Sequence, residues 1–321
     1  MGYAVISGYG IEGAVYGFLI TQITVFITAG VFIVLKIGFK FPKFSNLRKY
    51  LAFSIPTVPG SISNWITDSS DRYIIVLFLG STWVGLYSPA YNLGNLVLML
   101  SYPFFIVLPV ILSKYHDENQ FKKVKFIFER ALKFYLLLAI PAVFGLSILS
   151  RPLLTILANQ EVAISSHMVT PLVALGGLLC GVYSILSIVL FLNGKNRITG
   201  SIMVIAAIFN LVLNLFLVPS VGIIGAAFAT LLAYLFSFTL VLRYSKIYLH
   251  LRFDYRFLTI SIVASVLMSL LIILINPQGF LEISLTIIFS VIIYILVLIG
   301  LKGLNRDEVK FFKGLIKFGR I

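Results

Sequence analysis

The sequence predicts an all-α membrane protein, a polytopic helix bundle with about nine transmembrane helices. The chain of 321 residues is 60% hydrophobic and only 11% charged, whereas soluble domains carry charges on about a quarter of their residues. Its mean hydropathy is +1.06, which leaves too little polar surface for a water-soluble fold. Apolar windows of about twenty residues, the length that crosses a bilayer, recur along the whole chain.

The expected spans follow one another from end to end of the chain. All should be helices, because backbone amides in lipid must find hydrogen bonds within their own segment, and no alternating pattern of barrel strands is present. Largely uncharged windows cover residues 13–35, 83–112, 134–150, 162–192, 198–219, 222–242, 257–276 and 281–301, and one further span, 51–79, is interrupted by charges.

The basic residues predict the orientation. Nearly all of the 25 lysines and arginines fall in alternate loops, on one side of the membrane. Arg151 is expected on the other side, with Glu12, Glu161 and Glu282. The positive-inside rule therefore predicts a multi-pass protein of the cell (cytoplasmic) membrane, with the N-terminus of this chain outside and its C-terminus in the cytoplasm. The net charge of +14 suits membrane lipids and not nucleic acid, because the apolar spans confine charges to loops.

A short internal repeat suggests the domain organisation. G-I-E-G-A at 10–14 opens the first span much as G-I-I-G-A at 222–226 opens the seventh, and transporters are often built from two related halves. We therefore expect 1–37 to hold the last helix of an otherwise missing first lobe, 38–50 to be a basic cytoplasmic linker, 51–243 to be a six-helix second lobe, and 244–321 to be two additional transmembrane helices with a basic cytoplasmic tail. The alternative is a small-residue packing motif.

The span 51–79 is the least apolar of the set. It contains Asp68, Asp71 and Arg72, and each charge near a helix centre costs roughly 2.5–3.5 kcal/mol on insertion scales, so these side chains should face protein or water. Prolines kink helices because they remove a backbone hydrogen bond. A bend is therefore expected in the cytoplasmic half of this span, which contains Pro56, Pro59 and Gly60.

Three polar side chains share one depth in the predicted bundle. Asp71, Asn210 and Thr230 each lie eight or nine residues from an outer turn, which at 1.5 Å per residue is roughly 12–14 Å below the outer surface. Folding the 198–242 hairpin sets Asn210 opposite Thr230, and Asn214 opposite Ala226. Oxygen ligands of this kind suit a hard cation. Interhelical hydrogen bonding by buried Asn and Thr is the alternative, and it needs no ion.

Other polar side chains could meet a substrate. A cavity that binds sugars could be lined by Asp68, Arg72, Tyr87, Tyr91, Asn92 and Asn95. The alternative for the tyrosines is packing near the membrane interface. Basic side chains at the cytoplasmic helix ends could contact a pyrophosphate, or only anchor helices against lipid headgroups; these are Arg130, Lys133, Lys195 and Arg197.

The sequence offers no enzyme motif. Its three histidines lie near different loops, and no H-E-x-x-H, nucleophile elbow or P-loop occurs. Cys180 lies in an apolar span, so neither a disulfide framework nor a cysteine metal site is expected. We therefore expect no catalytic residue, no cofactor other than a sodium ion or proton, and no metal other than a monovalent cation.

Several segments in combination resemble one family. They are S-S-D-R-Y-I-I at 69–75 with V-G-L-Y-S-P-A-Y at 84–91, N-G-K-N at 193–196, and N-x₃-N-x₄-P-x₂-G-x₂-G-A at 210–226. These segments resemble polysaccharide (O-antigen type) flippases of the multidrug/oligosaccharidyl-lipid/polysaccharide exporter superfamily. The resemblance implies a fourteen-helix, two-lobed rocker-switch transporter whose first five helices are absent here. It also implies the flipping of a polyprenyl-linked oligosaccharide from the cytoplasmic to the outer leaflet in polysaccharide biosynthesis.

The resemblance also implies an ion site. In the lipid II flippase branch, sodium is held by an Asp, two side chains four apart on one helix, and a carbonyl and a Thr on the next. These roles carry over to Asp71, Asn210, Asn214, Ala226 and Thr230. That branch has a carboxylate where this chain has Asn214, so a proton on Asp71 is the alternative coupling ion.

Two other functions stay open at this point. One is a drug or organic-cation exporter of the same fold. The other is a non-transporting membrane subunit of a glycan-assembly complex, with a glycan polymerase or glycosyltransferases as partners. If the protein is a flippase, its expected substrate is a lipid-linked oligosaccharide, beside the membrane lipids that surround it.

Overall fold

The computed structural model describes residues 10–38, 47–48, 51, 55, 58–249 and 254–303. Within these ranges every regular element is a helix, so the predicted all-α class is confirmed. Among the described residues, eight helical segments are long and apolar enough to cross a membrane. The chain divides into two compact units, Met1–Ser54 and Ile55–Ile321.

The first unit contains one long helix, α2 (Gly10–Ile37). Its large apolar side chains are exposed all round, with Phe26 and Leu35 each 80% exposed. A helix that is apolar on every face needs lipid or other helices around it. Gly10 begins α2 with φ +50°, and Gly222 precedes α11 with φ +73°, so each of the two repeat segments opens its helix with a glycine at positive φ.

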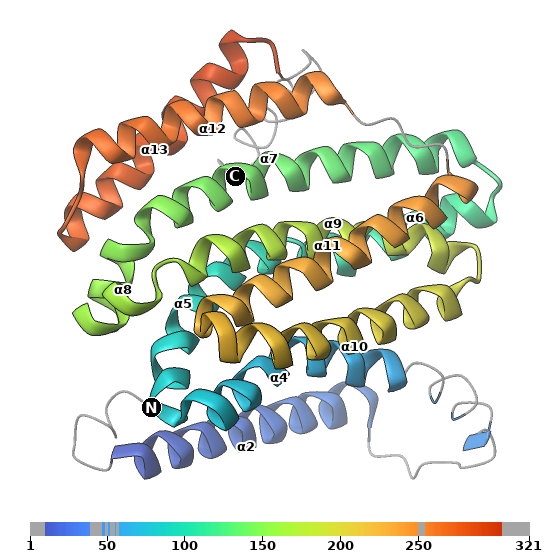
Figure 1. The fold of residues 1–321 in the computed structure, drawn as a ribbon. Helices are drawn as coiled ribbons and strands as arrows, with labels where there is room; N and C mark the ends of the chain where they lie inside the picture. The colour runs from blue at the N-terminus through green and yellow to red at the C-terminus, as the bar shows by residue number, and fades with distance from the viewer. Residues whose placement is uncertain are drawn as a thin grey trace. The chain divides into compact units, whose positions relative to one another are not determined.

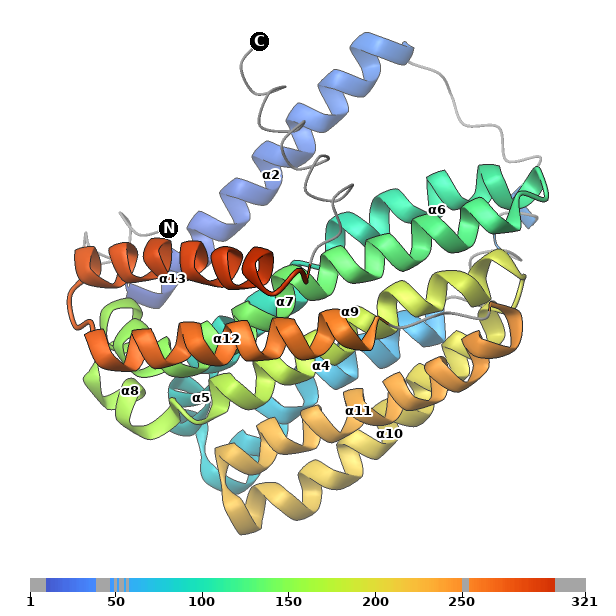
Figure 2. The same ribbon diagram turned by 90° about the horizontal axis from the view of Figure 1, so that it is seen from above.

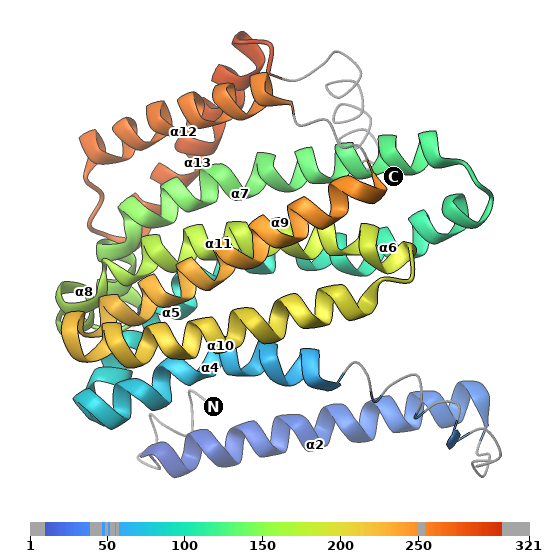
Figure 3. The same cartoon turned by 45° about the vertical axis from the view of Figure 1, so that its right-hand side comes forward.

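The second unit is a bundle of antiparallel helices (Figure 1). Its elements are α4 (Val58–Leu79), α5 (Ser81–Met99), α6 (Tyr102–Asp117), α7 (Phe121–Leu157), α8 (Gln160–Ser166), α9 (Val169–Leu192), α10 (Asn196–Val221), α11 (Ile223–Tyr248), α12 (Tyr255–Ile275) and α13 (Phe280–Gly300). Helix α9 lies at the centre and packs against α5, α7 and α11. On one side α10 packs against α11 and α4, and on the other α12 packs against α7 and α13 (Figures 2 and 3).

Two helix boundaries differ from the sequence prediction. Helix α4 begins at Val58, so Pro59 lies in its first turn, where the missing N–H of a proline costs no helical hydrogen bond. Pro56 and Thr57 lie outside the described residues, so the bend expected in this part of the span stays a prediction. The window 83–112 forms two helices, α5 and α6, which meet at Leu100 and Ser101 because a proline follows in the first turn of α6.

Small residues allow the helices around the site to approach closely. A Cβ atom on Gly225 of α11 would lie 2.4 Å from the backbone oxygen of Leu217 on α10. A Cβ atom on Gly94 of α5 would lie 2.7 Å from the backbone oxygen of Thr170 on α9. Both distances are shorter than real contacts allow, so these helix pairs can pack this closely only with glycine at both positions.

Candidate functional site

A group of buried amides and hydroxyls joins α10 to α11. Asn210, Asn214 and Thr230 have fully buried side chains. Asn210 Nδ2 donates to Thr230 Oγ1 at 3.3 Å, and Thr230 Oγ1 donates to the carbonyl of Ala226 at 3.2 Å. Asn214 Nδ2 donates to Asn210 Oδ1 at 3.1 Å. The predicted juxtaposition of Asn210 and Thr230 across the hairpin is confirmed, and we call these four residues the amide cluster.

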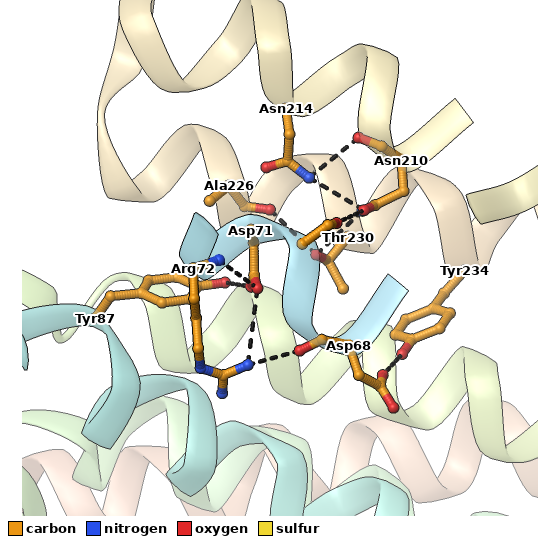
Figure 4. Close-up of polar contacts among 10 residues, drawn as sticks. Asp68, Asp71, Arg72, Tyr87, Asn210, Asn214, Ala226, Thr230 and Tyr234 are labelled. Atoms are coloured by element: carbon orange, nitrogen blue, oxygen red, sulfur yellow. Dashed lines mark hydrogen bonds and ion pairs between the residues drawn. The ribbon is translucent and has the colours of Figure 1, made fainter. Parts of the chain in front are cut away.

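A second group surrounds Asp71 in the middle of α4. The side chain of Asp71 is fully buried. Its Oδ2 accepts a hydrogen bond from Tyr87 Oη on α5 at 2.5 Å, and its Oδ1 accepts one from the backbone N–H of Arg72 at 2.8 Å. Arg72 Nη1 lies 3.7 Å from Asp71 Oδ1. Figure 4 shows this carboxylate turned toward Tyr87 and Arg72. We call Asp71, Arg72 and Tyr87 the acid cluster.

The five residues predicted to hold an ion thus fall into two adjoining clusters. Ser70, the neighbour of Asp71 on α4, donates to Asn210 Oδ1 at 3.2 Å and so connects α4 to the amide cluster. Across the described part of the chain, no hydrogen bond joins the Asp71 carboxylate to Asn210, Asn214 or Thr230. The structure therefore brings the uncharged ligands together and directs the carboxylate to other partners.

The predicted cavity residues have two kinds of environment. Tyr87 and Tyr91 are buried, at 0% and 3% exposure, and their rings lie 5.6 Å apart. Arg72 Cζ lies 4.7 Å from the centre of the Tyr91 ring. Asn92 is exposed and Asn95 is half-buried on the same helix. In this arrangement Tyr87 belongs to the acid cluster and Tyr91 contacts it, and the amide side chains are the accessible part of the predicted cavity lining.

Asp68 lies one helical turn before Arg72 and contacts α11. Tyr234 Oη donates to Asp68 Oδ1 at 2.7 Å, and Arg72 Nη1 donates to the backbone oxygen of Asp68 at 2.6 Å. The sequence reasoning missed both Tyr234 and Ser70. A signal existed for each, because Tyr234 follows Thr230 by four residues and shares its face of α11, and Ser70 is next to Asp71.

The predicted pyrophosphate contacts lie apart from both clusters. Lys133 Nζ lies 3.1 Å from Asp254 Oδ2 and joins α7 to the start of α12. Arg130 stacks on the Phe126 ring, with Cζ 4.2 Å from the ring centre. Lys195 and Arg197 are exposed at the start of α10. These basic residues lie on α7 and at the start of α10, and the structure gives Lys133 and Arg130 protein partners.

Asp254 is the residue outside the spans whose protonation the structure most clearly affects. Partial burial raises its pKa, but hydrogen bonds from the Phe257 N–H and from Lys133, with the Lys133 charge, outweigh burial and hold that pKa below its usual range. The Phe257 N–H lies 3.0 Å from Asp254 Oδ1, which makes Asp254 the N-cap of α12.

The oxygen atoms of the amide cluster are suitable ligands for a hard monovalent cation. Hard cations take carbonyl, amide, hydroxyl and carboxylate oxygens, and the cluster supplies all of these except a carboxylate. Asn214 Oδ1 is buried and has no hydrogen-bond partner among the described residues, although buried polar atoms are nearly always satisfied. Within the described part of the chain, no group of three or more His, Cys, Asp or Glu gathers as a transition-metal site would require.

Comparisons with known proteins identify the family. Residues 3–165, half of the chain, match the family model described as "Polysaccharide biosynthesis protein". The chain belongs to this family. The family assignment made from the sequence motifs is thereby confirmed.

Two relatives of this family member are named as flippases. The chain is 25% identical over 284 residues to the "Probable low-salt glycan biosynthesis flippase Agl15" of Haloferax volcanii, covering 87% of this chain and 59% of that protein. It is 27% identical over 245 residues to the "Probable flippase AglR" of the same organism, covering 71% of this chain and 48% of that protein. The chain thus spans about half to three-fifths of the length of these relatives.

A solved structure of similar fold covers nearly all of the chain. The "Lipid II flippase MurJ, inward closed conformation" matches with a TM-score of 0.72 over 97% of this chain and 64% of the other, at 20% sequence identity. At this identity the match establishes the fold. The family member is therefore a multi-pass helical membrane protein with the architecture of that flippase.

Proposed function

We propose that this chain forms part of a transporter that flips a polyprenyl-linked oligosaccharide from the cytoplasmic to the outer leaflet of the cell membrane. The family match, the flippase fold and the names of the Haloferax relatives support this proposal. The observation that carries it is the buried carboxylate of Asp71, paired with the half-buried Arg72 in the middle of α4 and beside the amide cluster. Charged groups at that depth are costly in a bundle that only scaffolds other proteins.

We further propose that transport is coupled to a monovalent cation held by Asp71, Asn210, Asn214, the carbonyl of Ala226 and Thr230. The shared burial of these residues and the unpartnered Asn214 Oδ1 support the proposal. Asp71 would supply the negative charge that the amide cluster lacks. A proton on Asp71 is the competing coupling ion. Coupling to sodium would require a sodium gradient, whereas coupling to a proton would require a pH gradient.

The test is transport by the full-length protein in proteoliposomes. A fluorescent polyprenyl-linked oligosaccharide is loaded in one leaflet, and its movement is followed with a membrane-impermeant quencher under a sodium gradient or a pH gradient. We expect Asp71→Asn to abolish gradient-driven movement, whereas the matched control Asp254→Asn should retain it. Unchanged movement in Asp71→Asn would exclude the coupling role, and no movement in the wild-type protein would exclude the flippase.

The proposed orientation places the turn between α12 and α13 outside and the turn between α6 and α7 in the cytoplasm. Cys180 is the single cysteine of this chain, so Cys180→Ser leaves the chain without a thiol. In that background Gln278→Cys should react with an impermeant maleimide in intact cells, and Lys122→Cys should react only after permeabilisation. The reverse pattern would invert the proposed topology.

A glycan polymerase or glycosyltransferase as partner stays a prediction.

A further inference from the structure

The guanidinium of Arg72 acts as an internal cation at Asp71. Its Nη1 lies 3.7 Å from Asp71 Oδ1 and also donates to the Asp68 carbonyl at 2.6 Å. Its Cζ lies 4.7 Å from the centre of the Tyr91 ring. The Asp71 side chain is 0% exposed, while that of Arg72 is 28% exposed. One end of this ion pair is therefore buried, and the other reaches the surface of the second unit.

Two further oxygens of the proposed ion site also accept hydrogen bonds from protein donors. Asp71 Oδ2 accepts from Tyr87, and Asn210 Oδ1 accepts from Ser70 and from Asn214 Nδ2. The amide of Asn214 thus presents its N–H group to the cluster and leaves its oxygen without a partner. Turning this amide by 180° would bring two amide oxygens together. Two acceptors facing each other require a cation or another donor between them.

These contacts describe a cation-free arrangement in which protein donors satisfy the Asp71 carboxylate and Asn210 Oδ1, while Asn214 Oδ1 is left without a partner. For Asp71 to join Asn210 and Asn214 around a cation, its carboxylate would turn from the contacts with Arg72 and Tyr87 that hold it in this structure. Arg72 then loses its anionic partner while keeping the aromatic face of Tyr91. A guanidinium is weakly hydrated and binds phosphate oxygens through paired N–H groups, so a released arginine is suited to an anionic phosphate.

We propose that Arg72 is a displaceable counter-charge: it neutralises Asp71 until a cation binds there, and then binds a phosphate group of the substrate. This inference rests on the function and the cation site proposed above. The same guanidinium pairs with Asp71 or with phosphate, so a cation at Asp71 frees Arg72 for the anion, and the anion frees Asp71 for the cation. Each ligand therefore strengthens the binding of the other by the same factor.

The experiment measures sodium binding instead of transport. Full-length protein is purified in lipid nanodiscs, and sodium affinity is measured by titration calorimetry with and without polyprenyl pyrophosphate. In the wild-type protein we expect the pyrophosphate to raise sodium affinity by about 5- to 150-fold, the usual range of coupling between two sites. Arg72→Gln removes the competitor, so this variant should bind sodium more tightly than wild type, and the pyrophosphate should no longer change its affinity.

Matched variants separate this role from a structural one. Arg151→Gln removes an exposed arginine elsewhere on the bundle and should leave sodium affinity unchanged. Arg72→Lys retains a positive charge and should keep the weaker, wild-type affinity. If Arg72→Gln does not fold, Tyr91→Leu removes the ring that supports the guanidinium and should shift sodium affinity in the same direction.

The outcomes distinguish this inference from the proposals on which it rests. Sodium binding that needs Asp71 but does not tighten in folded Arg72→Gln would overturn the displaceable counter-charge and leave the cation site standing. Weaker binding in that variant would also overturn it, because a purely structural arginine predicts that loss. A wild-type protein that binds no sodium would overturn both the cation site and this inference.

Discussion

Tyr87 on α5 donates a hydrogen bond to Asp71 on α4, with 2.5 Å between the phenol oxygen and Oδ2, and both side chains are fully buried. This bond joins α4, which carries an acid and a base near its middle, to the next helix of the chain, α5. It therefore contributes to the position of α4 as well as to the electrostatics of the site.

Removing this hydroxyl should destabilise the bundle. Tyr87→Phe deprives a buried carboxylate of a donor, and hydrogen bonds to charged groups contribute about 1.5–3 kcal/mol. The melting temperature of the purified protein should fall accordingly. Tyr102→Phe, which alters a tyrosine that is 48% exposed, should change it little. Equal melting temperatures for Tyr87→Phe and wild type would show that the bond contributes nothing to stability.

Restoring a carboxylate on α10 should strengthen cation binding. Asn214→Asp places a second negative charge beside the amide cluster, and we expect about tenfold tighter sodium binding, equivalent to about 1.4 kcal/mol. Without sodium the two buried carboxylates repel, so the variant should be less stable than wild type and gain more from added sodium. Thermal unfolding across a sodium titration measures both effects, and Asn92→Asp, at an exposed position, is the control. A variant insensitive to sodium would contradict the proposed ligand role of Asn214.

The α10–α11 hairpin should not tolerate a side chain at Gly225. Gly225→Ala would put a methyl group 2.4 Å from the backbone oxygen of Leu217, and overpacking of this kind costs about 1–3 kcal/mol. Gly200→Ala is the matched control, because nothing lies within 4 Å of its Cβ position, and in a helix it should stabilise by about 0.5–1 kcal/mol. We expect the melting temperature to fall in Gly225→Ala and to rise in Gly200→Ala. Equal changes in the two variants would mean that α10 and α11 move apart to accept the methyl group.

The Lys133–Asp254 pair should make stability depend on pH. The pKa of Asp254 is lowered in the folded state, so its contribution is present above the unfolded-state pKa of about 3.9 and is lost as pH falls through the folded-state pKa. Asp254→Asn should therefore reduce the melting temperature at pH 7 and differ less from wild type at about pH 3. Asn92→Ala, which changes an exposed side chain without a titratable group, should show no such dependence. A pH-independent difference for Asp254→Asn would exclude the ionic contribution.

The sequence by itself determined the all-α class, the positions of the spans and the pairing of Asn210 with Thr230 across their hairpin. These features are local: an apolar span must satisfy its own amides, and a short turn between two helices fixes which residues meet at equal distance from it. The partners of Asp71 were decided only by the tertiary structure. Helix α4 packs against α5, α10 and α11, and its rotation about its own axis decides which of these helices each of its faces contacts. The spacing of residues along one helix does not predict that rotation. For this reason the carboxylate predicted to join Asn210 and Asn214 is instead held by Tyr87 and Arg72.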